Sequence, residues 1–284
     1  MVRLIQISRV AILLLTAGLS SCVNLKYINN FSSESLKSIQ KFETISYSFK
    51  QCCLDNCINK KINNLNLDAE DCDCKLDEKA DSVTLILYNA VKGYFDGLHN
   101  LSDNELTNYK MDGLTKALNE GNFGSIKIEK KQVDAYSNIS KVLLRASTDE
   151  YRKHKIKGYV TEANEPVKVL IDCLDLNLSG NLAGKLNLQK QRIQSYCFDL
   201  TKDPSLSPFE KRLVVKDYYQ QLAEIEARQN ELRTYSKALK IIAEGHQKLA
   251  ANIDKFSNAE IKGLLFQYAC DIRDVVTEFE KIKN

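Results

Sequence analysis

The sequence predicts an all-α fold: a multi-helix bundle, stapled by disulfides, with a long antiparallel helical hairpin or coiled coil near the C-terminus. Apolar residues recur at steps of three and four along most of the chain, as they do on one face of an α-helix. Near the C-terminus they recur every seven residues, which favours a long helix packed against others. The 284 residues include three prolines and no tryptophan, a composition that fits long helices better than a β-sandwich.

The first two predicted helices flank a polar loop that contains cysteines. The first begins at Ser32 or Ser33 and ends near residue 64, with an apolar stripe of Leu36, Ile39, Phe42, Ile45 and Phe49. We interpret residues 22–31 as a short tether before this helix and residues 63–77 as the loop after it. The second helix is predicted to start near Asp77 and has a stripe of Val83, Leu87, Val91, Tyr94, Phe95 and Leu98.

The middle of the chain contains shorter helical segments. Ser102 and Glu105 have the spacing of a capping box, which predicts a helix from Ser102 to about residue 119. Residues 120–124 contain two glycines and are predicted to end it. A further helix is expected from about residue 129, running as far as residue 160. Pro166 is expected to interrupt the chain, and residues 177–186 are expected to form a turn.

The C-terminal part has the clearest helix signals. Ser207 as N-cap, Pro208 at the first helical position and Glu210 at the third predict a strong helix start. Two apolar rows follow, Ile225, Leu232, Leu239, His246 and Ile253 in one and Tyr235, Ile242, Leu249 and Phe256 in the other. Ser257 is expected to cap a last helix. Residues 32–284 are thus predicted to form one helical domain, with a candidate sub-boundary at residues 201–207.

The N-terminal segment has the pattern of an export signal. Arg3 and Arg9 make a basic start, and residues 10–19 are an apolar stretch shorter than the roughly 20 residues needed to cross a bilayer. Leu19-Ser20-Ser21-Cys22 resembles the lipobox of bacterial lipoproteins. The resemblance implies cleavage of residues 1–21 and lipidation of Cys22, so that the chain is anchored to a membrane. Val23 is typical of sorting to the outer membrane, facing the periplasm.

The charge balance excludes some partners. The chain has 40 basic and 37 acidic residues, and loss of Arg3 and Arg9 with the signal leaves a net charge of +1. Binding to nucleic acid needs a concentrated basic face, so no nucleic-acid partner is expected. The same balance argues against a strongly electrostatic membrane patch. The membrane partner is therefore the lipid anchor at Cys22, beside an envelope protein.

The cysteines predict a disulfide framework. Nine are present, and eight remain once Cys22 is lipidated: Cys52, Cys53, Cys57, Cys72, Cys74, Cys173, Cys197 and Cys270. An even number in an oxidising compartment favours disulfides, although the sequence cannot fix the pairing. We expect Cys52, Cys53 or Cys57 to pair with Cys72 or Cys74, and Cys173 with Cys197. If all eight pair, at least one bridge joins the N-terminal five to the C-terminal three.

Other chemistry is disfavoured by the spacing of the residues that would perform it. The N-terminal cysteines lack the paired Cys-x-x-Cys pattern of zinc sites. The acidic residues between 68 and 78 do not match a calcium-binding loop, and we interpret them as solvated. His99, His154 and His246 belong to no catalytic signature, and His246 is expected to be buried in the core. No metal and no cofactor is predicted.

These observations favour a non-enzymatic lipoprotein that acts as a binding or scaffold module in the cell envelope. It would present helical faces to another envelope protein. An alternative is a periplasmic immunity or inhibitor lipoprotein that neutralises a toxin or an envelope enzyme. An enzyme acting on the cell wall or on lipid is less expected, because it would need clustered carboxylates or a histidine-based site.

Overall fold

The predicted all-α bundle is confirmed. A computed structural model describes residues 20–67, 71–103, 123, 124, 126–148, 152–255 and 259–283, and these residues form helices and no strand. The elements in chain order are α2 (Ser20–Ile39), η1 (Gln40–Thr44), α3 (Phe49–Asn63), α4 (Lys75–Asp103), α6 (Lys130–Thr148), α7 (Arg152–Asp175), η2 (Leu176–Leu182), α8 (Ala183–Lys202), α9 (Pro208–Asn252), η3 (Ile253–Lys255) and α10 (Ala259–Lys283). None of these helices is long and apolar enough to cross a membrane.

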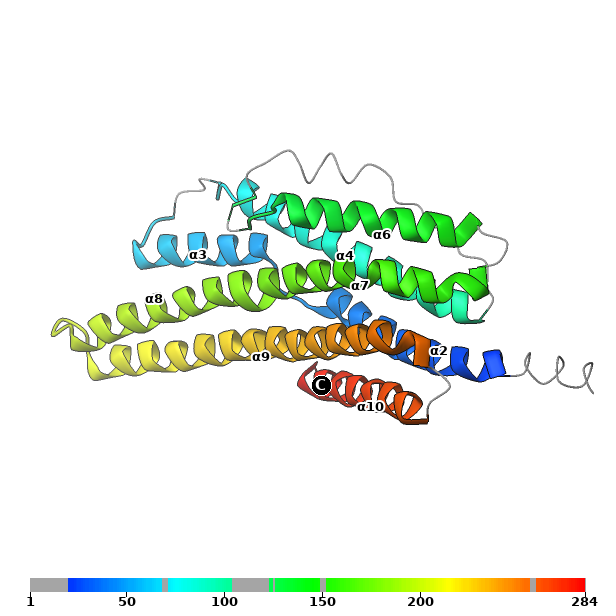
Figure 1. The fold of residues 1–284 in the computed structure, drawn as a ribbon. Helices are drawn as coiled ribbons and strands as arrows, with labels where there is room; N and C mark the ends of the chain where they lie inside the picture. The colour runs from blue at the N-terminus through cyan, green and yellow to red at the C-terminus, as the bar shows by residue number, and fades with distance from the viewer. Residues whose placement is uncertain are drawn as a thin grey trace, which may run out of the picture.

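The long helices lie side by side in an elongated bundle (Figure 1). α2 packs against α4 and α10, and α7 packs against α4, α6 and α9. α8 runs back along α9, so the two form the predicted antiparallel hairpin. The turn of this hairpin lies at one end of the bundle, and the start of α2 lies at the other.

The core is closed by aromatic side chains from helices far apart in sequence. Phe42 stacks on Tyr88 with ring centroids 4.4 Å apart. The Tyr235 hydroxyl donates to the Ile39 carbonyl at 3.0 Å and thereby satisfies one of the free carbonyls at the end of α2. Phe31 meets Phe95 edge to face at 6.2 Å. These contacts join α2, α4 and α9 into one core.

Helix α9 begins as predicted. Ser207 caps it, Pro208 follows at the first position, and both hydrogen bonds of the capping box with Glu210 are present. The first apolar row is buried along its whole length, as are the described members of the second: Tyr235, Ile242 and Leu249. Because α9 contacts α2, α7, α8 and α10, its core face is wider than the seam of a two-stranded coiled coil. Supercoiling of the hairpin stays a prediction.

The expected tether at residues 22–31 is wrong, because α2 runs through it. Ile28 is 2 % exposed and Phe31 is fully buried, so this segment is part of the core. Ser32 is not an N-cap. Its buried hydroxyl donates to the Ile28 carbonyl at 2.8 Å, one helical turn earlier. Burial of Ile28 and Phe31 extends the helix beyond the start that the serines suggested.

The long helix expected from Ser32 to residue 64 is divided in two. η1 ends at Thr44, residues 45–48 are extended, and α3 starts after Ser48. The Ser48 hydroxyl accepts from the Gln51 backbone N–H, and the Asp81 carboxylate of α4 accepts from the N–H groups of Phe49 and Lys50 at 2.8 and 3.0 Å. These caps satisfy the first donors of a new helix.

Two expected breaks are also wrong. Pro166 lies inside α7, and residues 177–186 continue the helix through a π-helical segment, η2, into α8. Leu170, Leu174, Leu178, Leu182 and Leu186 are all buried along this continuous helix. Their burial outweighs the weak helix propensity of the glycines there.

The helix start expected at Ser102 is wrong as well. Ser102 is inside α4, where it is buried and its hydroxyl donates to the His99 carbonyl at 2.6 Å. The rest of that expected helix, to residue 119, lies outside the described residues. Phe256 and the predicted cap Ser257 lie outside them too.

Gly245 sets the distance between α2 and α9. A Cβ atom at this position would lie 2.5 Å from Cε2 of the buried Phe31 ring. We expect Gly245→Ala to lower the free energy of unfolding by about 1–3 kcal/mol, because overpacking forces neighbouring side chains to shift. Urea unfolding followed by circular dichroism measures the change. Gly263→Ala in α10 is the control, since nothing lies within 4 Å of its new methyl group. Equal midpoints for both variants would contradict the argument.

Candidate functional site

Two of the predicted cysteine pairings are confirmed. Cys53 is bonded to Cys74 and Cys57 to Cys72, with Cα–Cα distances of 5.8 and 6.1 Å. Cys53 and Cys57 are four residues apart on α3 and therefore lie on one face of the helix. Cys72 and Cys74 lie in the segment just before α4. The two bridges together fix α3 against the start of α4.

The other four predicted disulfide cysteines are free thiols. Cys52, Cys173 and Cys197 are buried, and Cys270 is half-buried. The expected Cys173–Cys197 pair is wrong, because one continuous helix separates these residues by about 36 Å at 1.5 Å per residue. With four free thiols, the condition for a long-range bridge between the two halves of the chain is not met. Burial raises the pKa of the Cys173 thiol to about 11, which keeps it protonated and unreactive.

The other residues considered for chemistry are dispersed. No three His, Cys, Asp or Glu side chains in the described part of the chain form a group that could hold a metal ion. Asp77 pairs with Lys185 at 2.6 Å, while Asp68 and Glu70 lie outside the described residues. His99 lies 3.1 Å from the Asn29 amide nitrogen. The side chain of His154 is not among those described.

His246 is a core residue, as its place in the apolar row predicted. It is buried, and its Nε2 lies 2.6 Å from the Tyr94 hydroxyl. Burial lowers the pKa of His246 to about 3, so the ring is neutral at pH 7. Its Nδ1 atom has no hydrogen-bond partner among the described residues.

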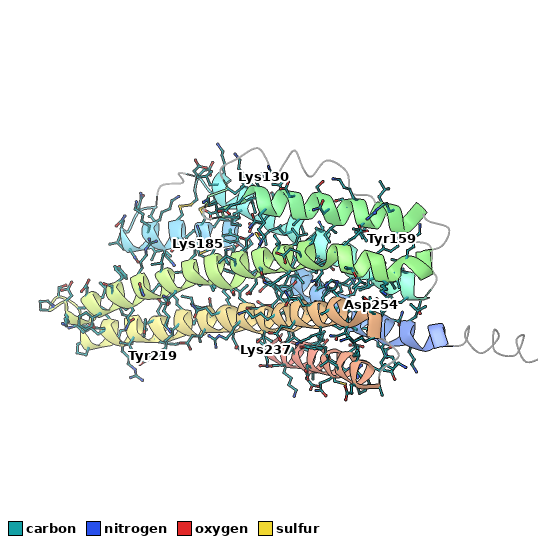
Figure 2. All side chains as sticks on the ribbon, in the orientation of Figure 1. Lys130, Tyr159, Lys185, Tyr219, Lys237 and Asp254 are labelled. Carbon is teal, nitrogen blue, oxygen red and sulfur yellow. A yellow bond between two sulfur atoms is a disulfide. The ribbon has the colours of Figure 1, made fainter. Side chains whose placement is uncertain are left out.

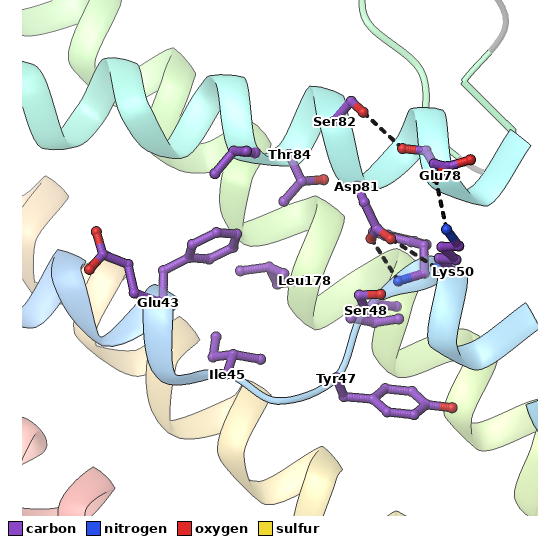
Figure 3. A pocket seen from close by; sticks show the side chains of 14 residues that line it. Glu43, Ile45, Tyr47, Ser48, Lys50, Glu78, Asp81, Ser82, Thr84 and Leu178 are labelled. Carbon is purple, nitrogen blue, oxygen red and sulfur yellow. Dashed lines mark hydrogen bonds and ion pairs between the residues drawn. The ribbon is translucent and has the colours of Figure 1, made fainter. Parts of the chain in front are cut away.

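The described surface has a groove of about 600 Å³, which we call the apolar groove (Figure 3). Its walls come from the η1–α3 connection, the first turns of α4, and the π-helical segment η2. Apolar side chains form most of the wall: Phe42, Ile45, Phe49, Leu85, Leu178 and Leu182. A pocket of this size with an apolar wall and a few polar groups is the ordinary form of a ligand site.

Hydrogen bonds hold the polar rim of the apolar groove in place. Asp81 caps α3, and Lys50 pairs with Glu78 at 2.8 Å on one side of the groove (Figure 3). Glu43 on the opposite side binds Lys92 at 2.6 Å and also accepts from the Tyr88 hydroxyl. These contacts, the one with Lys92 first, lower the pKa of Glu43. The rim is thus rigid and more acidic than basic.

One wall of the apolar groove is π-helical. Asn177 in η2 is buried and donates to the Thr84 hydroxyl of α4 at 3.3 Å, which ties the two walls together. Single-turn π-helical segments occur frequently at functional sites. The wider turn places Leu178 and Leu182 toward the η1–α3 connection, so that all three elements contribute to one cavity.

Sequence reasoning missed the apolar groove. Phe42 and Ile45 were assigned to the stripe of one long helix, and Leu178 to a turn. The residues that meet in the groove lie up to 140 positions apart in sequence. The only local signal was Ser48, which has the residue type of an N-cap in the middle of the predicted helix.

The α8–α9 hairpin exposes further apolar side chains. Phe198, Phe209, Leu213 and Tyr219 are each at least half exposed around its turn. Tyr219 lies at the end of the bundle opposite Asp254 (Figure 2). With 45 residues, α9 is about 68 Å long at 1.5 Å per residue, so the hairpin turn is far from the start of α2.

Comparison with protein-family models, with curated proteins and with solved structures gives no match for this chain. The function has to be argued from the cavities and side chains of the chain itself.

Proposed function

We propose that this chain is an exported, membrane-anchored lipoprotein that binds another protein of the cell envelope without catalysing a reaction. The observation that carries the proposal is the apolar groove, a preformed cavity of about 600 Å³ that opens to solvent. Leu85 in its wall is 49 % exposed. An open apolar wall of this kind gains free energy when a partner covers it.

Export is supported by the cysteines and by the lipobox. Disulfides persist in oxidising compartments and are rare in the cytosol. This chain has two disulfides, and both lie within the 22-residue segment from Cys53 to Cys74. Lipidation of Cys22 would hold the start of α2 at the membrane, since Ile28 is already part of the core. The hairpin turn at the opposite end of the bundle would then point away from the membrane (Figure 1).

The chemistry of the groove suggests what it binds. Its wall accommodates a few apolar side chains, and its rim has Glu43, Glu78 and Asp81 against Lys50 and the Lys92 that pairs with Glu43. Net acidic charge at the rim favours basic or neutral residues beside the apolar ones. We therefore propose that the partner inserts an apolar segment flanked by basic residues.

A crosslinking pull-down from native envelopes tests this, with a C-terminal tag that leaves Cys22 free. We expect one dominant partner, and recovery about tenfold lower with Leu85→Asn, which corresponds to about 1.4 kcal/mol of lost affinity. Leu188→Asn is the matched control, because Leu188 is 53 % exposed on α8 outside the groove. Unchanged recovery with Leu85→Asn, or equal loss with both variants, would overturn the groove as the binding site.

A further inference from the structure

A second groove runs between α3 on one side and α8 and α9 on the other; we call it the amide groove. It consists of two adjoining cavities of about 310 and 490 Å³. Asn59, Gln189 and Ile193 line both, so the two form one continuous depression. The amide groove is separate from the apolar groove, and Tyr47 lies between them. Tyr47 lines the apolar groove, while its hydroxyl contacts Asp55 and Gln189 of the amide groove.

Side-chain amides are concentrated along this groove. Asn56, Asn59 and Asn63 follow each other on one face of α3, and Gln189, Gln220 and Gln221 face them from α8 and α9. An amide has both donors and an acceptor and no charge. A row of amides therefore matches a ligand that also alternates donors and acceptors. From Asn56 to Asn63 the row spans about 10 Å, the length of about three residues of an extended peptide.

Most of these amides have hydrogen-bonding capacity left over. The side chains of Asn59, Asn63 and Gln220 make no hydrogen bond within the described part of the chain. The Asn56 and Gln221 nitrogens donate to the Cys52 carbonyl and to Asp217, which leaves both amide oxygens as acceptors.

Gln189 is the most informative of the amides, because it is 4 % exposed and lines both cavities. One of its amide atoms contacts the Tyr47 hydroxyl at 3.3 Å. Whichever way round the amide lies, its other polar atom has no partner among the described residues. This atom is not fully buried, so it can bind water or a ligand that enters the groove.

The floor of the amide groove is already rigid. Asp55 accepts from the Tyr47 hydroxyl at 3.0 Å, from Arg228 at 3.1 Å and from Gln51 at 2.8 Å. The Arg228 guanidinium also stacks over the Tyr47 ring, 4.3 Å from its centroid. These contacts join α3 to α9, and the two disulfides hold α3 on its neighbouring face. A preformed site lowers the entropy cost of binding.

The two ends of the groove have opposite charge. Asp217 and Glu224 lie in the cavity beside α9, whereas Lys60 and Arg192 lie in the other cavity. No carboxylate in the described part of the chain pairs with either of these two basic residues. A ligand with a cationic end and an anionic end would therefore complement both cavities at once.

We propose that the amide groove binds a short extended peptide. Its main-chain N–H and C=O groups bind the amide row and Gln189, its amino end lies near Asp217 and Glu224, and its carboxylate lies near Lys60 and Arg192. Both peptide ends are charged at neutral pH. A glycan fits less well, because none of the described side chains lining the two cavities is aromatic, and a sugar ring has no flat apolar face to pack against. The inference does not depend on lipidation of Cys22 or on the apolar groove.

Isothermal titration calorimetry with the full chain in detergent tests the proposal. The probes are penta-alanine with free ends, penta-alanine with both ends blocked, and chitotetraose. We expect the free peptide to bind, the blocked peptide to bind about tenfold more weakly because both charged contacts are lost, and chitotetraose to show no heat of binding. Binding of chitotetraose without penta-alanine, or of neither, would overturn the proposal.

Variants locate the binding. Asn59→Ala combined with Asn63→Ala should weaken binding of penta-alanine about tenfold. Asn63 is exposed and Asn59 is half-buried, and neither side chain makes a hydrogen bond within the described part of the chain. Asn138→Ala, at an exposed position on α6, is the matched control and should leave binding unchanged. A urea midpoint for each variant confirms folding. Equal affinity for the double variant and the control would place the peptide elsewhere and overturn the assignment.

Discussion

Loss of both disulfides is expected to lower the free energy of unfolding by about 5 kcal/mol, whereas loss of either one alone should cost about 2 kcal/mol. The bridges Cys53–Cys74 and Cys57–Cys72 are nested, with sequence separations of 21 and 15. In the chain-entropy model, a bridge over a loop of this length stabilises by about 3 kcal/mol. Once one bridge has restricted the unfolded chain, the second closes only the short segments between the two, which the same model values at about 2 kcal/mol, so the two contributions are not additive.

The measurement is urea unfolding of three variants: Cys57→Ser with Cys72→Ser, Cys53→Ser with Cys74→Ser, and all four substitutions together. Cys270→Ser is the control, because Cys270 is a half-buried free thiol. If each double variant lost as much stability as the fourfold variant, the bridges would be acting as a single unit. If the losses simply added, the nested-loop argument would be wrong.

The parts of the fold that could be predicted from sequence are those in which local and tertiary signals agree. In α9 the capping box of Ser207 and Glu210 and the two apolar rows indicate the same helix, and the structure has it. In α4 the stripe from Val83 to Leu98 is buried as predicted. The pairing of α3 cysteines with Cys72 and Cys74 could be expected because short loops bring those segments together.

The parts that could not be predicted depend on residues distant in sequence. Ile45 and Phe49 continue the helical spacing of η1, yet the helix stops between them because Asp81 of α4 provides a cap for a new one. Ile28 and Phe31 are buried where α2 packs against α4, α9 and α10, and this packing extends the helix beyond its expected start.

The same reason accounts for both grooves. Gln189 and Asn59 are ordinary polar residues in their own helices, and only the packing of α3 against α8 brings them to one cavity. A sequence pattern records the period of a single element. It does not show which other helix packs against the apolar face, so sites formed between helices cannot be predicted from it.

His246 is expected to make the fold unstable in acid. Its pKa is lowered to about 3 by burial, while an unfolded histidine has a pKa of about 6.5. Below pH 6.5 the unfolded state therefore binds a proton that the folded state excludes, and stability falls as the pH falls toward 3. The expected loss is about 1.4 kcal/mol per pH unit, or roughly 4–5 kcal/mol over the whole window.

The surroundings of His246 allow its contribution to the pH dependence of the free energy of unfolding to be measured separately. The rings around it are those of Tyr94 and Phe95, which carry no charge there, since burial raises the pKa of Tyr94. Carboxylates elsewhere also titrate below pH 5, so the comparison needs a variant without the imidazole. His246→Gln retains an acceptor for the Tyr94 hydroxyl and has no charge at any pH. We expect the free energy of unfolding to fall more steeply between pH 6 and pH 4 in the parent chain than in this variant. Parallel pH profiles would show that the buried ring accepts a proton without cost and would contradict the assignment of its environment.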